Sequence, residues 1–359
     1  MWPDRRILDL FGIELPILQA PMAGSSDAAL AIAVGEAGGL GALPCAMFTP
    51  EQFRTQMGIV RQRTARPVNA NFFCHRPPQP DAAREAAWRR RLEVYYAEFG
   101  IDPATIPAGP GRAPFDAAFC DLVVELRPEV VSFHFGLPEK SLLGRVRDTG
   151  AKIISSATTV EEARRLEGAG CDAVIAQGCE AGGHRGMFLA DDISAQPGTF
   201  ALVPQVADAV KVPVIAAGGI ADARTMVAAL VLGASAVQVG TAYLSCPESL
   251  IHPLHRAALR QARDDATVLT NVFTGRPARG LINRVIREVG PMSAESPAFP
   301  LATGAVAPLR ARAEAAGTGD FSPLWAGQSA ALAREMPAAD LTRSLAEGAA
   351  DLMSRLSRR

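Results

Sequence analysis

The chain has 359 residues, of which 48% are hydrophobic and 20% are charged, and its formal net charge at pH 7 is −1. Basic and acidic residues are interspersed, so nothing indicates a surface that binds nucleic acid. The six cysteines form no CxxC pair, which argues against a zinc site or a redox dithiol. No apolar run approaches the roughly 20 residues of a membrane-spanning helix, and the N-terminus lacks the apolar segment of a signal peptide. We therefore expect a cytoplasmic globular protein with reduced thiols, no metal and no membrane partner.

Short apolar segments recur along the chain and predict β-strands. They are nearly continuous in apolar character rather than alternating, which is typical of strands buried on both faces of a parallel sheet. In chain order these segments are residues 16–22, 40–44, 68–73, 130–135, 152–157, 173–178, 214–219 and 236–241.

Alanine-rich stretches between these segments predict helices, most clearly at residues 27–39, 159–170 and 222–234. Each opens with a residue suited to cap a helix (Asp27, Thr159 and Asp222) and ends in glycine just before the next strand. Eight such strand–helix units predict an α/β protein with a (β/α)8 TIM barrel. An open doubly wound sheet is the alternative, but no GxGxxG motif follows the first strand.

Two segments do not fit a minimal barrel. Residues 74–120 form an insertion after the third strand, with a helix expected near residues 81–100. Residues 247–329 predict a smaller α/β lid domain inserted after the eighth strand, over the barrel mouth. The helical tail at 330–359 is expected to return to the barrel, which would otherwise occupy residues 1–246.

The active site of such a barrel lies at the carboxyl ends of its strands. Here those ends are polar and rich in glycine, with no carboxylate pair, no metal cluster and no Ser-His-Asp arrangement. They carry residues 20–24, Asn69, Asn71, His134, Ser156, Gln177, Gly218, Gly219, Gly240 and Thr241.

Glycine-rich loops follow the seventh and eighth predicted strands, at residues 216–223 and 238–244. In barrels these two loops commonly bind phosphate, because glycine lets backbone N–H groups approach the phosphate oxygens. The hydroxyl of Thr241 can add a further donor. The pattern therefore predicts a ligand that carries a phosphate.

The other strand ends suggest what the phosphate is attached to. Asn71, Gln177 and Gln238 can each donate and accept hydrogen bonds, which suits a ring with mixed donors and acceptors. Residues 20–24 offer backbone groups to the edge of a flat ring. The residues alone predict a phosphorylated aromatic cofactor, with flavin as the first candidate.

Six motifs, in the same order and over most of the chain, resemble those of the nitronate monooxygenases, formerly called 2-nitropropane dioxygenases. They read PILQAPMAG, VNANFF, VVSFHFG, QGCEAGGHRG, VPVIAAGGIAD and AVQVGTAYL, and a seventh, FTGRPARGLINR, is similar to the class I branch. Part of the pattern, including EAGGH, also resembles the FMN- and NADH-dependent enoyl-acyl-carrier-protein reductases.

The resemblance implies one non-covalent FMN and the oxidation of alkyl nitronates, such as propionate 3-nitronate, by O2 without NAD(P)H. The products would be a carbonyl compound and nitrite, and the partners small nitronates or nitroalkanes and O2. The implied catalytic base is His184. The implied flavin contacts are Pro21, Met22, Ala23, Asn71, Gln177, Gly182, Gly219, Gly240 and Thr241, with Gly218 and Gln238 as further candidates.

His184 fits two chemical roles. A neutral imidazole can abstract the α-proton of a nitroalkane, and a protonated one can hold the negative charge of a nitronate. An ordinary pKa near 6.5 would make both states accessible. Of its neighbours, Arg185 is expected to face solvent or pair with an acidic residue, and Glu180 to bind backbone amides.

Further residues bear on the substrate. Asn69 and His134 are candidate substrate contacts. In the lid, Phe299 and Arg310 lie where the class I resemblance implies a tyrosine and a lysine, which leaves the substrate preference open. An NADH-linked reductase of enoyl thioesters and a non-catalytic phosphate-binding barrel are the alternatives. The oligomeric state is also left open.

Overall fold

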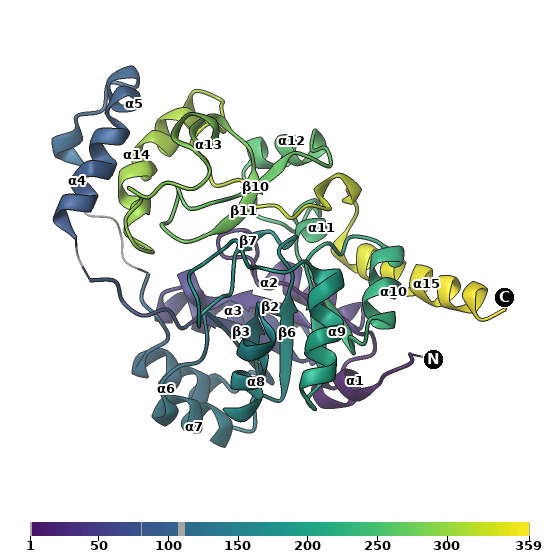
Figure 1. Ribbon diagram of the computed structural model, residues 1–359. Coiled ribbons are helices and arrows are strands. Elements are labelled where there is room, and N and C mark those ends of the chain that lie inside the picture. Colours follow the sequence, from purple (N-terminus) through teal and green to yellow (C-terminus); the bar gives the residue numbers. More distant parts are fainter. Residues whose placement is uncertain (1, 80, 107–111, 359) are drawn as a thin grey trace.

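Eight parallel strands form a closed ring in residues 2–79, 81–106 and 112–358, which the computed structural model describes (Figure 1). They follow in the order β1-β9-β8-β6-β5-β4-β3-β2, and a parallel bridge between Leu18 and Leu40 closes the ring. The strands are β1 (Ile17–Gln19), β2 (Gly41–Pro44), β3 (Val68–Phe73), β4 (Val130–His134), β5 (Lys152–Ala157), β6 (Ala173–Gln177), β8 (Val214–Ala217) and β9 (Ala236–Val239). Each lies within a predicted segment, so the TIM barrel is confirmed and the open sheet is wrong.

Helices cover the outside of the ring, and their starts follow the predicted caps. The side chains of Asp27, Thr159 and Asp222 each accept a hydrogen bond from the first turn of their helices. The outer helices are α2 (Ala28–Glu36), α3 (Pro50–Arg63), α6 (Ala117–Leu126), α7 (Lys140–Asp148), α8 (Val160–Gly168), α9 (Thr199–Ala209), α10 (Ala223–Val231) and α15 (Ala338–Leu356). The C-terminal α15 packs against α10 and α2 and so completes the ring (Figure 1).

A short first helix, α1 (Arg6–Phe11), closes the amino ends of the strands. Ile7 and Phe11 belong to one buried cluster with inward-facing side chains such as Leu18, Ile154 and Ile215. Because side chains alternate along a strand, the next inward-facing residues lie one layer higher, toward the carboxyl ends. This apolar cluster occupies the lower layer of the barrel interior and leaves the upper layer, near the carboxyl ends of the strands, for polar side chains.

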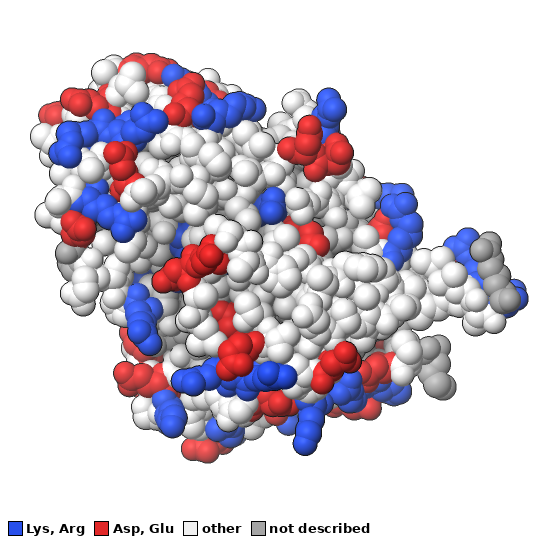
Figure 2. All heavy atoms as spheres, viewed as in Figure 1, with Lys and Arg blue, Asp and Glu red and all other residues white. Residues whose placement is uncertain are grey.

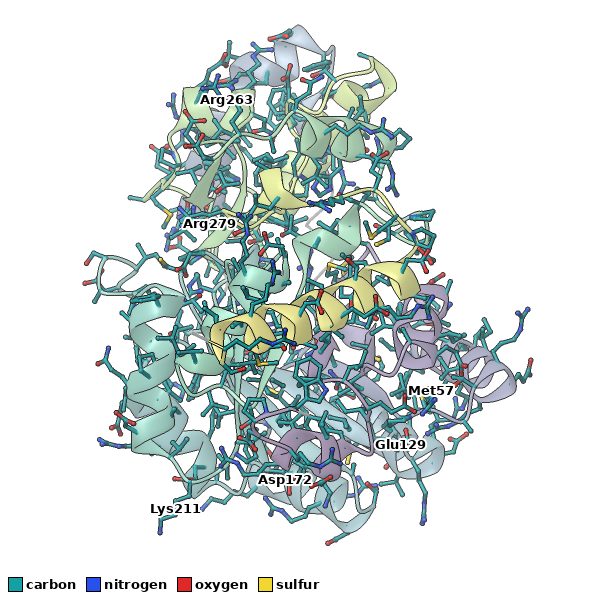
Figure 3. All side chains as sticks on the ribbon, turned by 90° about the vertical axis from the view of Figure 1, so that its right-hand side faces the viewer. Met57, Glu129, Asp172, Lys211, Arg263 and Arg279 are labelled. Atoms are coloured by element: carbon teal, nitrogen blue, oxygen red, sulfur yellow. The ribbon has the colours of Figure 1, made fainter. Side chains whose placement is uncertain are left out.

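Above the barrel lies a smaller layer of helices and strands (Figure 1). Its antiparallel sheet has the order β10-β11-β7, and β7 belongs to the loop after β6. Figure 3 shows Arg279 of this sheet between the barrel and the upper layer, where its Nε donates to the carbonyl of Cys179 at 2.8 Å. The strands of this sheet are β7 (Gly183–His184), β10 (Thr267–Thr270) and β11 (Ala278–Leu281). The α-helices between β9 and α15 in the chain are α11 (Thr241–Leu244), α12 (Pro253–Arg260), α13 (Arg284–Val289) and α14 (Ala302–Ala315). Short 3-10 helices lie elsewhere in the chain, at Cys45–Met47, Pro103–Thr105 and Ala330–Leu332.

The helices of the insertion after β3 pack on this lid. The insertion contains α4 (Ala82–Arg91) and α5 (Glu93–Glu98), where a single helical region was predicted. Trp88 and Tyr96 are fully buried in a core shared with Phe321 of the lid, and the Tyr96 hydroxyl donates to the carbonyl of Ala305 at 2.7 Å. The lid core thus extends into the insertion, whereas the domain boundaries at residues 246 and 330 stay a prediction.

The surface carries charges of both signs. On the face in Figure 2, basic and acidic side chains are interspersed. Within the described structure, exposed side chains form ion pairs, such as Arg54 and Glu125 at 2.8 Å. Among the described helices, none combines the length and the apolar character needed to cross a membrane.

Candidate active site

The upper layer of the barrel interior opens into a cavity beneath the lid. Inward-facing side chains from successive strands line it, as expected from their alternation along each strand. These side chains are Asn71, Phe73, Ser132, His134, Ser156, Ile175, Gln177, Ala217 and Gln238. The cavity therefore lies at the carboxyl ends of the strands, where barrels carry their active sites.

The cavity brings together nearly all the residues selected from the sequence. His184 and His134 line it, as do the proposed flavin contacts Pro21, Met22, Ala23, Asn71, Gln177, Gly182, Gly218, Gly219, Gln238, Gly240 and Thr241. Asn69 does not. It lies two residues before Asn71 on the same face of β3, and so one layer deeper in the barrel, with 1% of its surface exposed. We therefore withdraw Asn69 as a substrate contact.

His184 is held in a strand between the barrel and the lid. In the antiparallel pairing of β7 with β11, the backbone of His184 lies opposite Ala278. Its Nε2 lies 2.9 Å from the Oγ1 of Thr274, a lid residue. The rings of Phe299 and Trp325 lie 5.3 and 5.4 Å from the imidazole, centroid to centroid. The histidine is thus fixed by backbone pairing, one hydrogen bond and aromatic contacts.

Two side chains from the barrel hold the loop that carries His184. Gln177 Nε2 donates to the His184 carbonyl at 3.0 Å, and Gln177 Oε1 accepts from the Gly186 N–H at 2.7 Å. His134 Nε2 lies 3.2 Å from the same carbonyl, and its Nδ1 lies 3.0 Å from Ser156 Oγ. Gln177 and His134 therefore position the loop as well as lining the cavity.

The environment of His184 selects one protonation state. Burial lowers the pKa of its imidazole well below the ordinary value, and the nearby positive charges of Arg112 and Arg276 lower it further. Burial likewise lowers the pKa of His134 to about 3. Both histidines are neutral at physiological pH. The lowered pKa of His184 therefore disfavours the protonated state, which an ordinary pKa near 6.5 would make accessible.

The two charged neighbours in the same loop are structural. Arg185 was expected to face solvent or an acidic residue, but it is fully buried. Its guanidinium donates to the carbonyls of Gln177, at 2.7 Å, and Gly178, and to Gln196 Oε1. Its five donors suit a strand end that presents several carbonyls at once. The carboxylate of Glu180 accepts hydrogen bonds from the backbone N–H of Thr199, at the start of α9. This contact is of the kind expected for Glu180, which was predicted to bind backbone amides.

The glycine-rich loops after β8 and β9 also line the cavity, and β8 lies next to β6, which leads into the loop that carries His184. Gly218 and Gly219 have φ angles of 113° and 71°, in the left-handed region that favours glycine. The C-terminal end of the lid segment closes on these loops. Gly327 N–H donates to Thr241 Oγ1, and Ser329 Oγ donates to the Gly219 carbonyl, both at 2.9 Å.

Sequence reasoning missed several residues of this cavity. Trp325, Gly327 and Ser329 come from the C-terminal end of the lid segment 247–329, and Arg112 comes from the insertion after β3. None belongs to a strand end, the signal used to select candidates. Of the two lid residues selected, Phe299 packs on His184, whereas Arg310 pairs with Glu314 at 2.8 Å and does not line the cavity.

In the described part of the chain, no group of three or more His, Cys, Asp or Glu side chains is placed to hold a metal ion. The cavity combines histidines, amides, aromatic rings and glycine-rich loops, a set that suits an organic ligand.

Comparison with known proteins identifies the family of the chain. The family model described as nitronate monooxygenase matches residues 4–348. A nitronate monooxygenase of Pseudomonas aeruginosa is 46% identical over 344 residues, covering 95% of this chain and 98% of the relative. One from Paraburkholderia phytofirmans is 42% identical, covering 95% and 94%.

Solved structures agree with this assignment. Nitroalkane oxidase from Streptomyces ansochromogenes is 40% identical with a TM-score of 0.89, covering 98% of this chain and 99% of its own. FabK from Thermotoga maritima is 31% identical with a TM-score of 0.75, covering 98% of both chains. The similarity spans the whole fold, including the lid. The chain therefore belongs to the nitronate monooxygenase family, a family of oxidoreductases.

Proposed function

We propose that this protein oxidises alkyl nitronates with O2 and without NAD(P)H, using one FMN bound non-covalently in the cavity. The observation that carries the proposal is the pairing of two features in one cavity. A neutral His184 and the glycine loops that suit a phosphate line the same cavity. The products would be a carbonyl compound and nitrite.

The residues present fit FMN. The side-chain oxygen Oε1 of Gln238 is buried and lacks a hydrogen-bond partner within the described structure, so it suits a donor of a bound ring. Gly219 and Gly240 line the cavity without a side chain that would keep a phosphate from their backbone N–H groups, and Pro21 and Met22 would border the ring. Bound there, FMN would take electrons from the nitronate and deliver them to O2.

His184 would act as the base for substrates that arrive as neutral nitroalkanes. Its neutral imidazole can accept the α-proton, whereas a preformed nitronate needs no proton removed. The rings of Phe73, Phe299 and Trp325 surround His184 and would exclude water from a reacting carbon bound beside it. His134 and Gln177 would keep the loop in place during the reaction.

One experiment tests cofactor and reaction together. The visible absorption spectrum of the purified protein is recorded, and oxygen uptake and nitrite release are then followed with propionate 3-nitronate. A flavin spectrum, and oxygen uptake without NADH, are the expected results. Rapid NADH oxidation with an enoyl thioester, and none with a nitronate, would favour the reductase alternative. A colourless protein that takes up no FMN would favour a non-catalytic barrel.

A further inference from the structure

One arginine lines the cavity, and it comes from the insertion rather than from the barrel. Arg112 follows residues 107–111, which carry no acidic side chain in the sequence. Within the described structure its guanidinium takes part in no ion pair, although several exposed arginines do, including Arg54 and Arg284. Arg112 is thus a cation that faces a cavity without a carboxylate partner.

The surroundings of Arg112 make that charge unusual. Its guanidinium carbon lies 5.8 Å from the centroid of the Phe299 ring, and burial lowers the pKa of the guanidinium. Arginine nevertheless stays protonated at neutral pH. A partly desolvated charge is costly unless a hydrogen-bonding anion compensates it. The site therefore favours an anionic ligand. The planar guanidinium of arginine can donate two parallel hydrogen bonds to a carboxylate.

Among the described residues that line the cavity, no free carboxylate is available to pair with Arg112. Glu180 is the one acidic residue among the described lining residues, and both its carboxylate oxygens bind Thr199 at the start of α9. A second arginine nearby, Arg276, is engaged elsewhere: its guanidinium lies over the Phe135 ring at 4.1 Å and donates to the Met187 carbonyl.

The Phe299 ring lies against both Arg112 and His184. The imidazole of His184 is 5.3 Å from the ring centroid, and the guanidinium of Arg112 is 5.8 Å from it. The reacting carbon of a substrate must lie beside His184 for proton transfer. Arg112 would then meet the other end of a short substrate that runs along Phe299.

We propose that Arg112 is a specificity-determining residue that binds a carboxylate at the tail of the substrate. Among the alkyl nitronates of the proposed function, Arg112 would distinguish a tail that ends in a carboxylate from a tail of the same length that ends in a methyl group. This inference rests on the proposed function for the identity of the reacting group. The tail contact itself depends only on the cavity.

The test compares two three-carbon substrates that differ in their tail. Oxygen uptake by the flavin-loaded enzyme is measured with propionate 3-nitronate and with propyl-1-nitronate, in the wild type and in Arg112→Gln. We expect kcat/KM to fall about tenfold to hundredfold for the carboxylate substrate, mainly through KM, and less than about threefold for the other. Arg112→Lys should recover part of the loss.

Arg84→Gln is the matched control, because Arg84 is exposed on α4 of the same insertion and loses the same charge. It should leave both substrates unaffected. An equal loss on both substrates in Arg112→Gln would overturn the inference, because it would show that Arg112 binds the nitronate group itself or supports the fold.

A binding measurement separates this inference from the proposed function. Anaerobic calorimetric titration with 3-nitropropionate and 1-nitropropane needs no turnover. Selective weakening of 3-nitropropionate binding in Arg112→Gln supports the tail contact even if no nitronate is oxidised. Unchanged binding of 3-nitropropionate would sink the inference while leaving nitronate oxidation intact.

Discussion

The imidazole of His184 and the hydroxyl of Thr274 lie 2.9 Å apart, across the boundary between barrel and lid. The Thr274 hydroxyl is also 3.4 Å from the carbonyl of Arg276, to which it can donate. If it does, it accepts from Nε2–H of His184, and the Nδ1 atom keeps the lone pair that a base needs. The lid thus contributes to the orientation and the tautomer of the histidine.

Replacing Thr274 with Val should therefore slow the reaction of neutral nitroalkanes. The change removes the hydroxyl and keeps the shape, so we expect kcat for nitroethane to fall about threefold to tenfold, the effect of one ordinary hydrogen bond. The rate with ethyl nitronate should change little. Thr303→Val is the control, because its hydroxyl donates to the Phe273 carbonyl at 3.1 Å within the lid. Similar rate losses in both variants would argue against a role for Thr274 in orienting His184.

Replacing His184 with Asn should separate the two substrate forms. Without a base, the rate on nitroethane should fall about a hundredfold or more, since general base catalysis contributes at least that much. The rate on preformed ethyl nitronate should fall far less, because no proton has to be removed. Oxygen uptake with each substrate measures both effects. Equal losses would contradict the role as a base.

The pH dependence of nitroalkane oxidation should show a lowered pKa for His184. A histidine with an ordinary pKa of about 6.5 would lose half its base form at that pH. Burial and the charges of Arg112 and Arg276 lower the pKa of His184, so protonation begins only at lower pH. We expect kcat/KM for nitroethane to stay level as pH falls through 6.5 and to decline below it. An inflection near 6.5 in the wild type would show that the imidazole is more solvated than described.

Replacing Gly219 with Leu should weaken the binding of FMN. The residue has a φ angle of 71°, which strains any larger residue, and it lies in the loop proposed to hold the phosphate. We expect purified Gly219→Leu to contain much less flavin than the wild type. Gly168→Leu on α8 is the control, because Gly168 is exposed and has open space around its α-carbon. Full flavin content in Gly219→Leu would place the phosphate elsewhere.

Much of the barrel could be predicted because its signals are local. Asp27, Thr159 and Asp222 cap their helices as expected, and each predicted strand segment contains an observed strand. Strand ends then meet at one rim by topology alone, which is why Asn71, Gln177 and the glycine loops could be assigned to one cavity. Local backbone preference and the closure rule of the barrel carry this information.

The sequence alone therefore specified the barrel, the rim where chemistry occurs and most residues of the cavity. Long-range packing decided the rest. The charge state of His184 depends on Arg112 and Arg276, which are distant in the chain, and on burial beneath the lid. The burial of Arg185 and the closure of Gly327 over Thr241 likewise come from contacts between remote segments. Desolvation and charge–charge interactions depend on three-dimensional proximity, which no local pattern encodes.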